Sequence, residues 1–325
     1  MKIKLEQEIS AEKQEMRKAF CDTLLELSEY NKNIVVMDAD LMGAMGTKPF
    51  AEKYPERTID CGIQEANMIG AAAGLSAVGM IPFAHTFGAF ASRRAFDQVF
   101  LSGAYAKSNI KVIGSDPGIT AQINGGTHMP FEDMGLMCSV PGMTVIEPTD
   151  IAMLRWALKE MAGAYGMHYM RLVRKSCMKI YQDGSQFDMN RAVTLKDGTD
   201  VTVIASGYCV AEAMKAGEIL KGRGIDARII NVFCWKPIDQ ETIINAAIET
   251  GAVVTAENHN VMTGLGAAVA NVIVKNRPVP MEMVGVQDEF GEVGFVDYLS
   301  ERFGLNAEHI VKAALKAAAR KGEAV

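Results

Sequence analysis

The sequence predicts an α/β protein with two domains, each a mainly parallel sheet flanked by helices. Short apolar, β-rich runs alternate with segments of helical periodicity, which is typical of parallel sheets covered by helices. The chain has 325 residues, about twice a common domain length. A cluster of turn residues interrupts the alternation near residue 190. We therefore expect a first domain over residues 1–190 and a smaller second domain over residues 191–325.

Five apolar runs predict the strands of the first domain, and helical segments separate them. The expected strands are 33–37, 80–83, 110–114, 144–146 and 168–172. Helices are expected to begin near Ser10, Gln64, Ala91 and Thr149. At the last of these starts, Thr149 and Asp150 supply side chains that can cap free amide groups. The charged N-terminal segment, MKIKLEQEISAEKQEMRKAF, also has helical character.

The same alternation resumes in the second domain, after the interruption over residues 181–198. Two turn clusters, at 182–185 and 196–198, flank a short stretch without a clear period. Beyond them we expect strands at 201–205, 227–231 and 252–257, and helices at 209–223, 239–249 and 265–275. No short internal repeat is found, which excludes a solenoid.

The composition favours a packed, soluble protein with neither a nucleic-acid nor a membrane partner. Hydrophobic residues make up 49% and charged residues 22% of the chain, and the net charge is −6. No stripe of Lys and Arg suggests nucleic-acid binding, and no apolar segment reaches bilayer length. We expect a cytoplasmic location. The six scattered cysteines show no zinc spacing and are interpreted as buried thiols, a single reactive cysteine being the alternative.

A carboxylate at the start of a small-residue helix is the first candidate for chemistry. The stretch Asp-Cys-Gly-Ile-Gln-Glu over residues 60–65 ends a short strand and places Glu65 at a helix start. Taken alone, Glu65 has a structural explanation, because a glutamate there interacts favourably with the helix dipole. The stretch resembles the pyrimidine-binding domain of transketolases, whose cofactor is thiamine diphosphate. The resemblance implies that Glu65 contacts the aminopyrimidine ring nitrogen and favours the imino tautomer.

Two phenylalanines three residues apart follow in the stretch Thr-Phe-Gly-Ala-Phe-Ala-Ser-Arg, over residues 86–93. Such rings can line one wall of a pocket, although phenylalanines at this spacing are also common in cores. The stretch resembles a segment of the transketolase superfamily, which includes deoxyxylulose-phosphate synthases. By this resemblance Phe90 stacks on the aminopyrimidine and Phe87 lines the same pocket. Arg93 then lies near the substrate entrance.

A polar, glycine-rich loop over residues 116–130 follows the expected strand 110–114. Loops at the carboxyl ends of parallel strands are where α/β proteins hold their sites. The loop resembles the transketolase loop ending in Gly-x-Thr-His, which implies that His128 moves protons on sugar hydroxyls. Asn124 stands where many transketolases have an aspartate that reads the hydroxyls of the donor. Asp116 replaces a histidine associated with substrate phosphate, which an aspartate cannot attract, so the usual pentose-phosphate substrates are in question.

Two further residues are assigned by the same resemblance. Arg174, at the end of a strand, corresponds to an arginine that holds the acceptor phosphate, a task that suits a guanidinium fork. Asp40 matches an acidic residue beside the thiazolium ring, with the capping of a turn as an equal alternative. In the second domain, His259 is interpreted as a structural histidine.

The resemblance covers nearly the whole chain but only the second half of a full-length transketolase. The Gly-Asp-Gly motif with which transketolases bind the diphosphate and its metal is absent from the sequence. This implies a partner, an N-terminal transketolase subunit that binds the diphosphate and Mg²⁺ or Ca²⁺. We expect an α2β2 heterotetramer that is active on sugar phosphates only when both chains are present.

Other functions remain open at this point. The beta subunit of a 2-oxo-acid dehydrogenase decarboxylase has a similar length and the same kind of cofactor glutamate, and a deoxyxylulose-phosphate synthase-like enzyme is a related alternative. A noncatalytic scaffold is a third possibility. The loop at residues 125–130 and Arg174 favour a transketolase, which transfers a two-carbon ketol unit between sugars.

Overall fold

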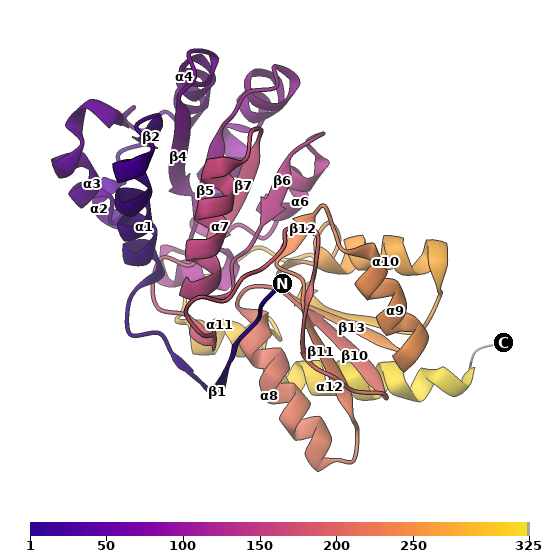
Figure 1. Ribbon diagram of the computed structural model, residues 1–325. Coiled ribbons are helices and arrows are strands. Elements are labelled where there is room, and N and C mark those ends of the chain that lie inside the picture. Colours follow the sequence, from indigo (N-terminus) through magenta and orange to yellow (C-terminus); the bar gives the residue numbers. More distant parts are fainter. Residues whose placement is uncertain (324–325) are drawn as a thin grey trace.

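The computed structural model describes residues 1–323, and its first sheet has seven strands in the order β12-β6-β7-β5-β4-β2-β3 (Figure 1). All neighbours are parallel except β12, which runs antiparallel to β6. The strands are β2 Ile34–Asp38, β3 Thr58–Asp60, β4 Ile81–Phe87, β5 Lys111–Ser115, β6 Thr144–Ile146, β7 His168–Leu172 and β12 Cys234–Lys236. Strands β2, β5 and β7 are buried along their full length, as expected for a sheet covered on both faces.

Helices cover both faces of this sheet. On one face, α1 (Met16–Tyr30) packs against α7 (Ile151–Gly163), whose Asp150 caps its first turn by accepting from the amide of Met153. On the other, α4 (Glu65–Ala77) packs against β4. Shorter helices lie in the connections: α2 Met42–Met45, α3 Lys48–Lys53, α5 Phe96–Gln98 and α6 Asp133–Ser139.

Several single-turn or irregular helices lie in the connections between the longer elements. They are η1 Pro55–Arg57, η2 Phe90–Arg94, η3 Val99–Tyr105, η4 Gly118–Asn124, η5 Gly126–His128 and, at the other end of the chain, η6 Arg320–Glu323. The helix expected near Ala91 is thus two π-helical segments, η2 and η3, on either side of α5. Such π segments are frequent at functional sites.

The second sheet has five strands in the order β14-β13-β10-β11-β9, all parallel except β9. Its strands are β9 Val193–Lys196, β10 Val201–Ala205, β11 Ala227–Asn231, β13 Val253–Asn260 and β14 Met281–Val286. Helices α8 and α12 pack together on one face, and α9 and α10 on the other. The helices are α8 Cys209–Gly222, α9 Gln240–Thr250, α10 Leu265–Asn276, α11 Val296–Arg302 and α12 Ala307–Ala319.

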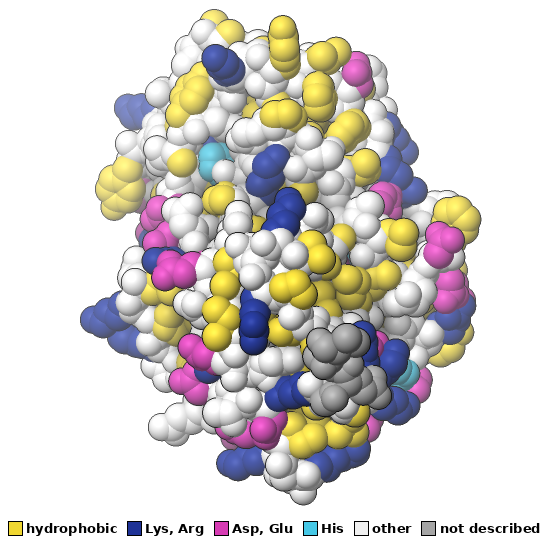
Figure 2. All heavy atoms as spheres, turned by 90° about the vertical axis from the view of Figure 1, so that its right-hand side faces the viewer, with side chains coloured by type: hydrophobic (Ala, Val, Ile, Leu, Met, Phe, Trp, Pro, Cys, Tyr) yellow, Lys and Arg dark blue, Asp and Glu magenta, His cyan; other side chains and the backbone are white. Residues whose placement is uncertain are grey.

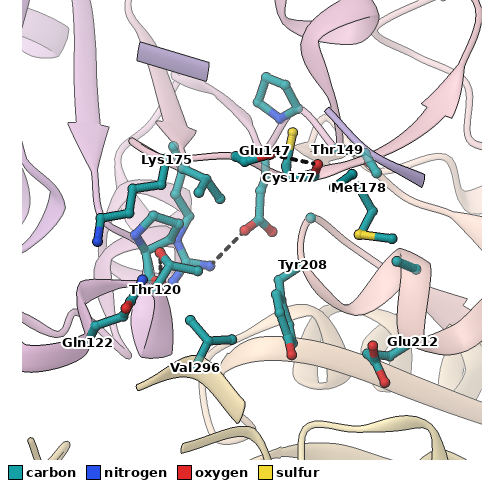
Figure 3. Close-up of a pocket in the computed structure, with 18 of the residues that line it drawn as sticks. Thr120, Gln122, Glu147, Thr149, Lys175, Cys177, Met178, Tyr208, Glu212 and Val296 are labelled. Atoms are coloured by element: carbon teal, nitrogen blue, oxygen red, sulfur yellow. Dashed lines mark hydrogen bonds and ion pairs between the residues drawn. The ribbon is translucent and has the colours of Figure 1, made fainter. Parts of the chain in front are cut away.

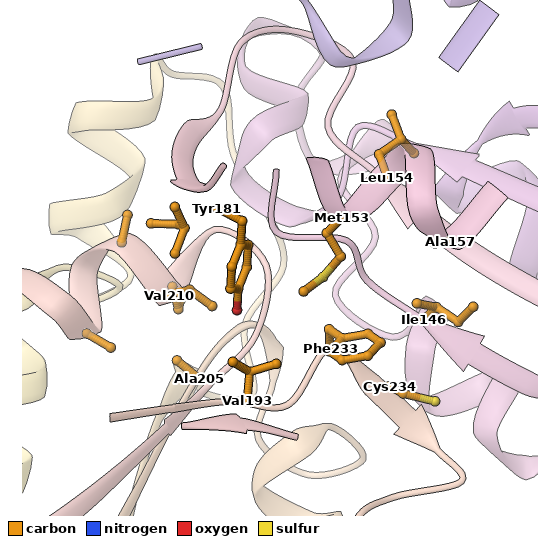
Figure 4. Close-up of a cluster of buried hydrophobic side chains, with 14 of the residues drawn as sticks. Ile146, Met153, Leu154, Ala157, Tyr181, Val193, Ala205, Val210, Phe233 and Cys234 are labelled. Carbon is orange, nitrogen blue, oxygen red and sulfur yellow. The ribbon is translucent and has the colours of Figure 1, made fainter. Parts of the chain in front are cut away.

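The two sheets are joined by more than a linker. Strand β12 follows β11 in the chain but completes the edge of the first sheet. The segment expected to be a variable boundary is also packed, since Phe187 lies 4.9 Å from the ring of Tyr181 and 5.9 Å from that of Phe233. Figure 4 shows Tyr181 and Phe233 beside Met153 in this junction. The domain division at residue 190 therefore remains a proposal.

The prediction for the N-terminal segment is wrong. Residues Leu5–Ala11 form strand β1, which pairs antiparallel with β8 (Met178–Tyr181), and the first helix begins only at Met16. The charged residues gave this segment its helical appearance, but apolar side chains such as Leu5 and Ile9 pack against the core, and β8 offers a free edge. Tertiary pairing thus overrides local propensity.

The surface mixes residue types. In Figure 2, hydrophobic side chains on the visible face lie among separate Lys, Arg, Asp and Glu side chains. Within residues 1–323, no helix combines the length and the apolar content needed to cross a bilayer.

Candidate active site

The candidate residues gather where the strands of the first sheet end. Phe87 is the last residue of β4, and Asp116 directly follows β5. Because β2, β4 and β5 are parallel neighbours, their carboxyl ends meet at one edge. Segments η2, η4 and η5 extend from this edge and carry Phe90, Asn124 and His128.

Three rings form an aromatic wall: Phe87 and Phe90, whose spacing predicts a shared wall, and His128, which the spacing did not place there. The centroid of Phe90 lies 6.0 Å from that of Phe87 and 5.0 Å from the imidazole of His128. Phe87 and His128 are 5.8 Å apart with their rings steeply tilted. Phe90 and His128 are half-buried, so part of each ring remains accessible. Such a wall suits a planar heterocycle.

Glu65 lies beside this wall with its carboxylate buried. It begins α4 and is 1% exposed. Nη1 of Arg94 donates to both carboxylate oxygens, at 2.8 and 2.9 Å. The same guanidinium lies 4.0 Å from the centroid of Phe90. Arg94 therefore bridges the buried carboxylate and the aromatic wall, a contact that the sequence prediction missed although Phe90 and Arg94 are four residues apart on a helical segment.

Arg93 points to the opposite side and braces the loop of His128. Its Nε lies 2.9 Å from Oε1 of Glu132, and its Nη2 donates to the carbonyl of Thr127 at 3.1 Å. The Nδ1 of His128 is 2.9 Å from the hydroxyl of Thr127. Burial raises the pKa of the Glu132 carboxyl, and the nearby Arg93 opposes that rise.

Asn124 lies at the end of the same irregular loop, half-buried. Two residues earlier, Gln122 adopts a left-handed backbone with φ 53°. A residue other than glycine in this conformation is strained, and such strain concentrates at functional sites. No hydrogen bond within residues 1–323 joins the Asn124 side chain to His128.

Arg174 and Asp116 form a pair at the other side of the wall. Nε of Arg174 lies 3.1 and 3.2 Å from the two carboxylate oxygens of Asp116. The Arg174 guanidinium is 5.2 Å from the centroid of Phe87. Arg174, predicted to hold the acceptor phosphate, is thus in contact with Asp116, the residue that replaces a histidine associated with substrate phosphate.

Asp40 follows β2 at the same edge but is exposed, and no hydrogen bond or ion pair of the described residues links its side chain to the aromatic wall. Its φ of 61° and the bond from its amide to Oδ1 of Asp60, 2.9 Å, fit the turn interpretation. Behind it, Nε2 of His85 lies 3.1 Å from Oδ2 of Asp38, and both side chains are fully buried. Burial raises the pKa of Asp38 to about 7 and lowers the pKa of His85 to about 3.

A buried ionic cluster, which the sequence prediction also missed, connects this site to the second domain. Arg171 is 0% exposed and lies 3.1 Å from Asp133 and 3.2 Å from Glu147. It also donates to the carbonyl of Asn258, on β13, at 2.8 Å. His259 is a satisfied structural histidine, with Nδ1 2.9 Å from the carbonyl of Asn260.

Two cavities flank the cluster and the loop. One of about 310 Å³ lies between the domains, with Thr120 and Lys175 on one side and Tyr208 on the other, and Glu147 points into it (Figure 3). A second of about 610 Å³ is lined by Arg93, Glu132 and Phe290.

The residues present fit one part of thiamine diphosphate. A buried carboxylate next to an accessible ring can bind the ring nitrogen and the face of an aminopyrimidine. Among residues 1–323, no group of three or more His, Cys, Asp or Glu side chains could hold a metal ion.

Family models and relatives agree on one family. The model of the transketolase pyrimidine-binding domain matches residues 12–179, and that of the transketolase C-terminal domain matches residues 190–310. The 6-deoxy-6-sulfo-D-fructose transketolase subunit SqwH of Clostridium sp. (strain MSTE9) is 51% identical, over 97% of this chain and 98% of that protein. An apulose-4-phosphate transketolase subunit of Phocaeicola vulgatus is 36% identical, over 92% of this chain and 96% of that protein.

Solved structures give the same result. A structure described as a split gene transketolase, inactive β4 tetramer, has a TM-score of 0.87 and 41% identity, covering 94% of this chain and 99% of that one. The transketolase of Leishmania mexicana, at 22% identity and a TM-score of 0.77, shares the fold over 98% of this chain and 47% of its own.

These matches define the class of protein as a thiamine diphosphate-dependent transferase. The chain belongs to the transketolase family, and it corresponds to the C-terminal subunit of a split transketolase, an enzyme that transfers a two-carbon ketol unit. The α/β fold and the family resemblance predicted from the sequence are thereby confirmed.

Proposed function

We propose that this chain supplies the cofactor-activating half of a split transketolase, with Glu65 as the activating residue. The observation that supports this is the buried Glu65 carboxylate beside the ring of Phe90, linked to it by Arg94. When bound, thiamine diphosphate supplies a nucleophilic carbon that carries the ketol unit. Glu65 would hold the ring nitrogen of its aminopyrimidine, while Phe87 and Phe90 contact the ring face.

The Arg94 side chain must move away before Glu65 can bind the ring nitrogen of the cofactor. Both oxygens of the carboxylate accept from Arg94, whose guanidinium also covers Phe90. An aminopyrimidine offers the same features as that guanidinium, namely a planar group with N–H donors, and so requires the same place. The Arg94 side chain is 45% exposed, so it can turn outward into the solvent.

The remaining candidates take roles at the substrate. His128, next to Phe90, would accept and return a proton on a sugar hydroxyl. Asn124 would hydrogen-bond a hydroxyl of the donor, and Arg93 would hold the loop at the entrance. Asp40 would lie near the thiazolium side of the cofactor.

We further infer that a diphosphate-binding partner chain completes the site, with its Mg²⁺ or Ca²⁺, in an α2β2 heterotetramer. The absence of a Gly-Asp-Gly motif from the sequence supports this, as does the description of the related β4 tetramer as inactive. All six cysteines are free thiols, in keeping with a reducing cytoplasm.

The substrate is proposed to be a sugar with a terminal anionic group. The names of the two relatives given above refer to a sulfonated and to a phosphorylated sugar. In this chain Arg174, whose guanidinium lies near Phe87, is placed to bind such a group.

Replacement of Glu65 tests the proposal. We expect E65Q, assembled with the partner subunit, to lose ketol transfer by about 10²–10⁴-fold, because the amide cannot exchange a proton with the ring nitrogen. Native mass spectrometry should show unchanged assembly. E52Q, an exposed glutamate on α3, is the control and should retain full turnover. Turnover of E65Q within a few-fold of the natural protein would contradict the role of Glu65.

A further inference from the structure

The Asp116–Arg174 pair is built into the protein rather than formed by chance at its surface. Asp116 is 2% exposed and has a left-handed backbone, with φ 57°. Among the side chains of residues 1–323, its two oxygens make polar contacts only with Arg174, whose Nε lies 3.1 and 3.2 Å from them. Burial raises the pKa of the Asp116 carboxyl, and the guanidinium of Arg174 acts against this rise.

The outer edge of the Arg174 guanidinium remains available. Within residues 1–323, no hydrogen bond engages its Nη atoms, and the group lies beside Phe87 on the aromatic wall. Two N–H donors on one edge suit two oxygens of a phosphate or of a sulfonate equally well, because both groups present tetrahedral oxygens. Hydrogen-bond geometry therefore does not separate these two ligands.

The sulfonate and the phosphate differ in their charge. A sulfonate carries one negative charge at neutral pH, whereas a phosphate ester carries about 1.5 to 2. The repulsion from the Asp116 carboxylate grows with the charge of the ligand, and the carboxylate also offsets the positive charge of Arg174. A phosphate consequently gains little from its second charge and still loses its hydration on entering the site.

We propose that Asp116 is a specificity-determining residue that makes the substrate site select a sugar with a terminal sulfonate over one with a terminal phosphate. The inference rests on the proposed function, in which Arg174 binds the terminal anionic group. Lys175, the next residue, lines the neighbouring cavity, and together with Arg17 it exerts an attractive field on Asp116. The paired carboxylate thus lowers a positive potential that would otherwise favour a dianion.

The test compares two donors with the assembled enzyme, 6-deoxy-6-sulfo-D-fructose and D-fructose 6-phosphate, with one aldehyde acceptor. We expect the natural protein to prefer the sulfonate. D116N removes the charge, keeps the shape and tolerates a left-handed backbone. We expect D116N to raise kcat/KM for D-fructose 6-phosphate about tenfold, chiefly through a lower KM. This tenfold change corresponds to about 1.4 kcal/mol. The value for the sulfonate should change by less than threefold.

The control is E132Q, which neutralises the carboxylate paired with Arg93 at 2.9 Å and should leave the ratio of the two donors unchanged. D116S serves as a second neutral variant, and unfolding curves show whether each variant is folded. The inference would be overturned if D116N and D116S, both folded, kept the ratio of kcat/KM for the two donors that the natural protein has. This includes the case in which kcat/KM rises equally for both donors. Loss of turnover in E65Q together with an unchanged ratio in D116N would refute the selectivity alone, whereas an active E65Q would refute the proposed function.

Discussion

At the scale of single residues, Arg94 competes for the groups that the cofactor would use. Its guanidinium binds the Glu65 carboxylate and covers Phe90 at 4.0 Å. Because the Arg94 side chain is 45% exposed, water screens the pair, and displacing this guanidinium by another partner of Glu65 costs less than breaking a fully buried pair. Displacing Arg94 therefore weakens cofactor binding by a modest factor, and the contact protects a buried carboxylate that would otherwise be left without a partner.

We predict that R94A binds thiamine diphosphate about fivefold more tightly in the assembled enzyme, because no cation has to be displaced. Isothermal titration calorimetry measures this affinity without turnover. R302A is the matched control, since Arg302 also lies over an aromatic ring, Phe303 at 4.9 Å, and pairs with Glu289. Weaker binding by R94A would show that Arg94 holds the cofactor rather than competing with it.

The sequence and the family resemblance proposed the residues of the candidate site but did not predict their pairings. The spacing of Phe87 and Phe90 predicted that these two rings share a wall, whereas His128 was assigned only by the resemblance of its loop to a transketolase loop, and the sequence did not place it on that wall. The contact of Arg94 with Glu65 was missed because the sequence does not distinguish the roles of two adjacent arginines. The backbone of η2 directs Arg93 to the loop of Thr127 and Arg94 to Glu65. Asp116 was recognised as a departure, while its partner Arg174 lies 58 residues away in the sequence, just after the neighbouring strand β7.

At the scale of elements, apolar runs predicted the buried parallel strands well, because such strands are apolar along their whole length. The short strand β12 was missed, since three residues carry no period and its pairing with β6 depends on the junction of the two domains. Strand β1 was mistaken for a helix for a similar reason. Its existence depends on β8, which lies far away in the sequence.

Strand β5 carries a buried lysine that makes its stability depend on pH. Nζ of Lys111 donates to the carbonyl of Ala164 and to Oδ1 of Asn109, both at 2.7 Å. Burial lowers the pKa of Lys111 to about 7. The unfolded chain, with an ordinary lysine pKa of 10.5, therefore binds more protons between pH 7 and 10.5. The contribution of Lys111 to stability grows as pH rises through this window and is lost as pH falls through 7.

We predict that K111M destabilises the protein by about 1–3 kcal/mol, since its buried acceptors lose their donor. The loss should be larger at pH 9 than at pH 7. Urea unfolding at both pH values gives the difference between variant and natural protein, which cancels the titration of other groups. K53M is the control, because Lys53 pairs with Glu29 at the surface. If the free energy of unfolding of K111M fell below that of the natural protein by the same amount at pH 7 and at pH 9, the pH dependence assigned to Lys111 would be wrong.

At the scale of the whole molecule, Arg171 joins the two domains around one buried charge cluster. It contacts Asp133 and Glu147, and it donates to the carbonyl of Asn258 on β13. Nothing in the apolar pattern of β7 distinguishes this arginine from a surface residue, because its partners come from three other segments. Burial raises the pKa of the Glu147 carboxyl, and Arg171 is the main group that opposes this rise.

We predict that R171M lowers the free energy of unfolding by about 3–5 kcal/mol, because it leaves buried carboxylates without their cation. Without Arg171, the pKa of Glu147 should rise further above its unfolded value. The penalty should therefore be smallest at low pH and should grow as pH rises through the pKa of the folded state. Guanidinium unfolding at pH 5 and pH 8, followed by tryptophan fluorescence, measures both effects.

The matched control is R191M, which breaks an exposed pair with Glu241 at 2.7 Å and should cost less than about 1 kcal/mol at either pH. If R171M behaved like R191M, the cluster would not join the domains. A loss in R171M that is larger at pH 8 than at pH 5 would show that the buried carboxylates carry the penalty. A loss of equal size at both pH values would instead point to packing around the side chain, because a cavity does not titrate.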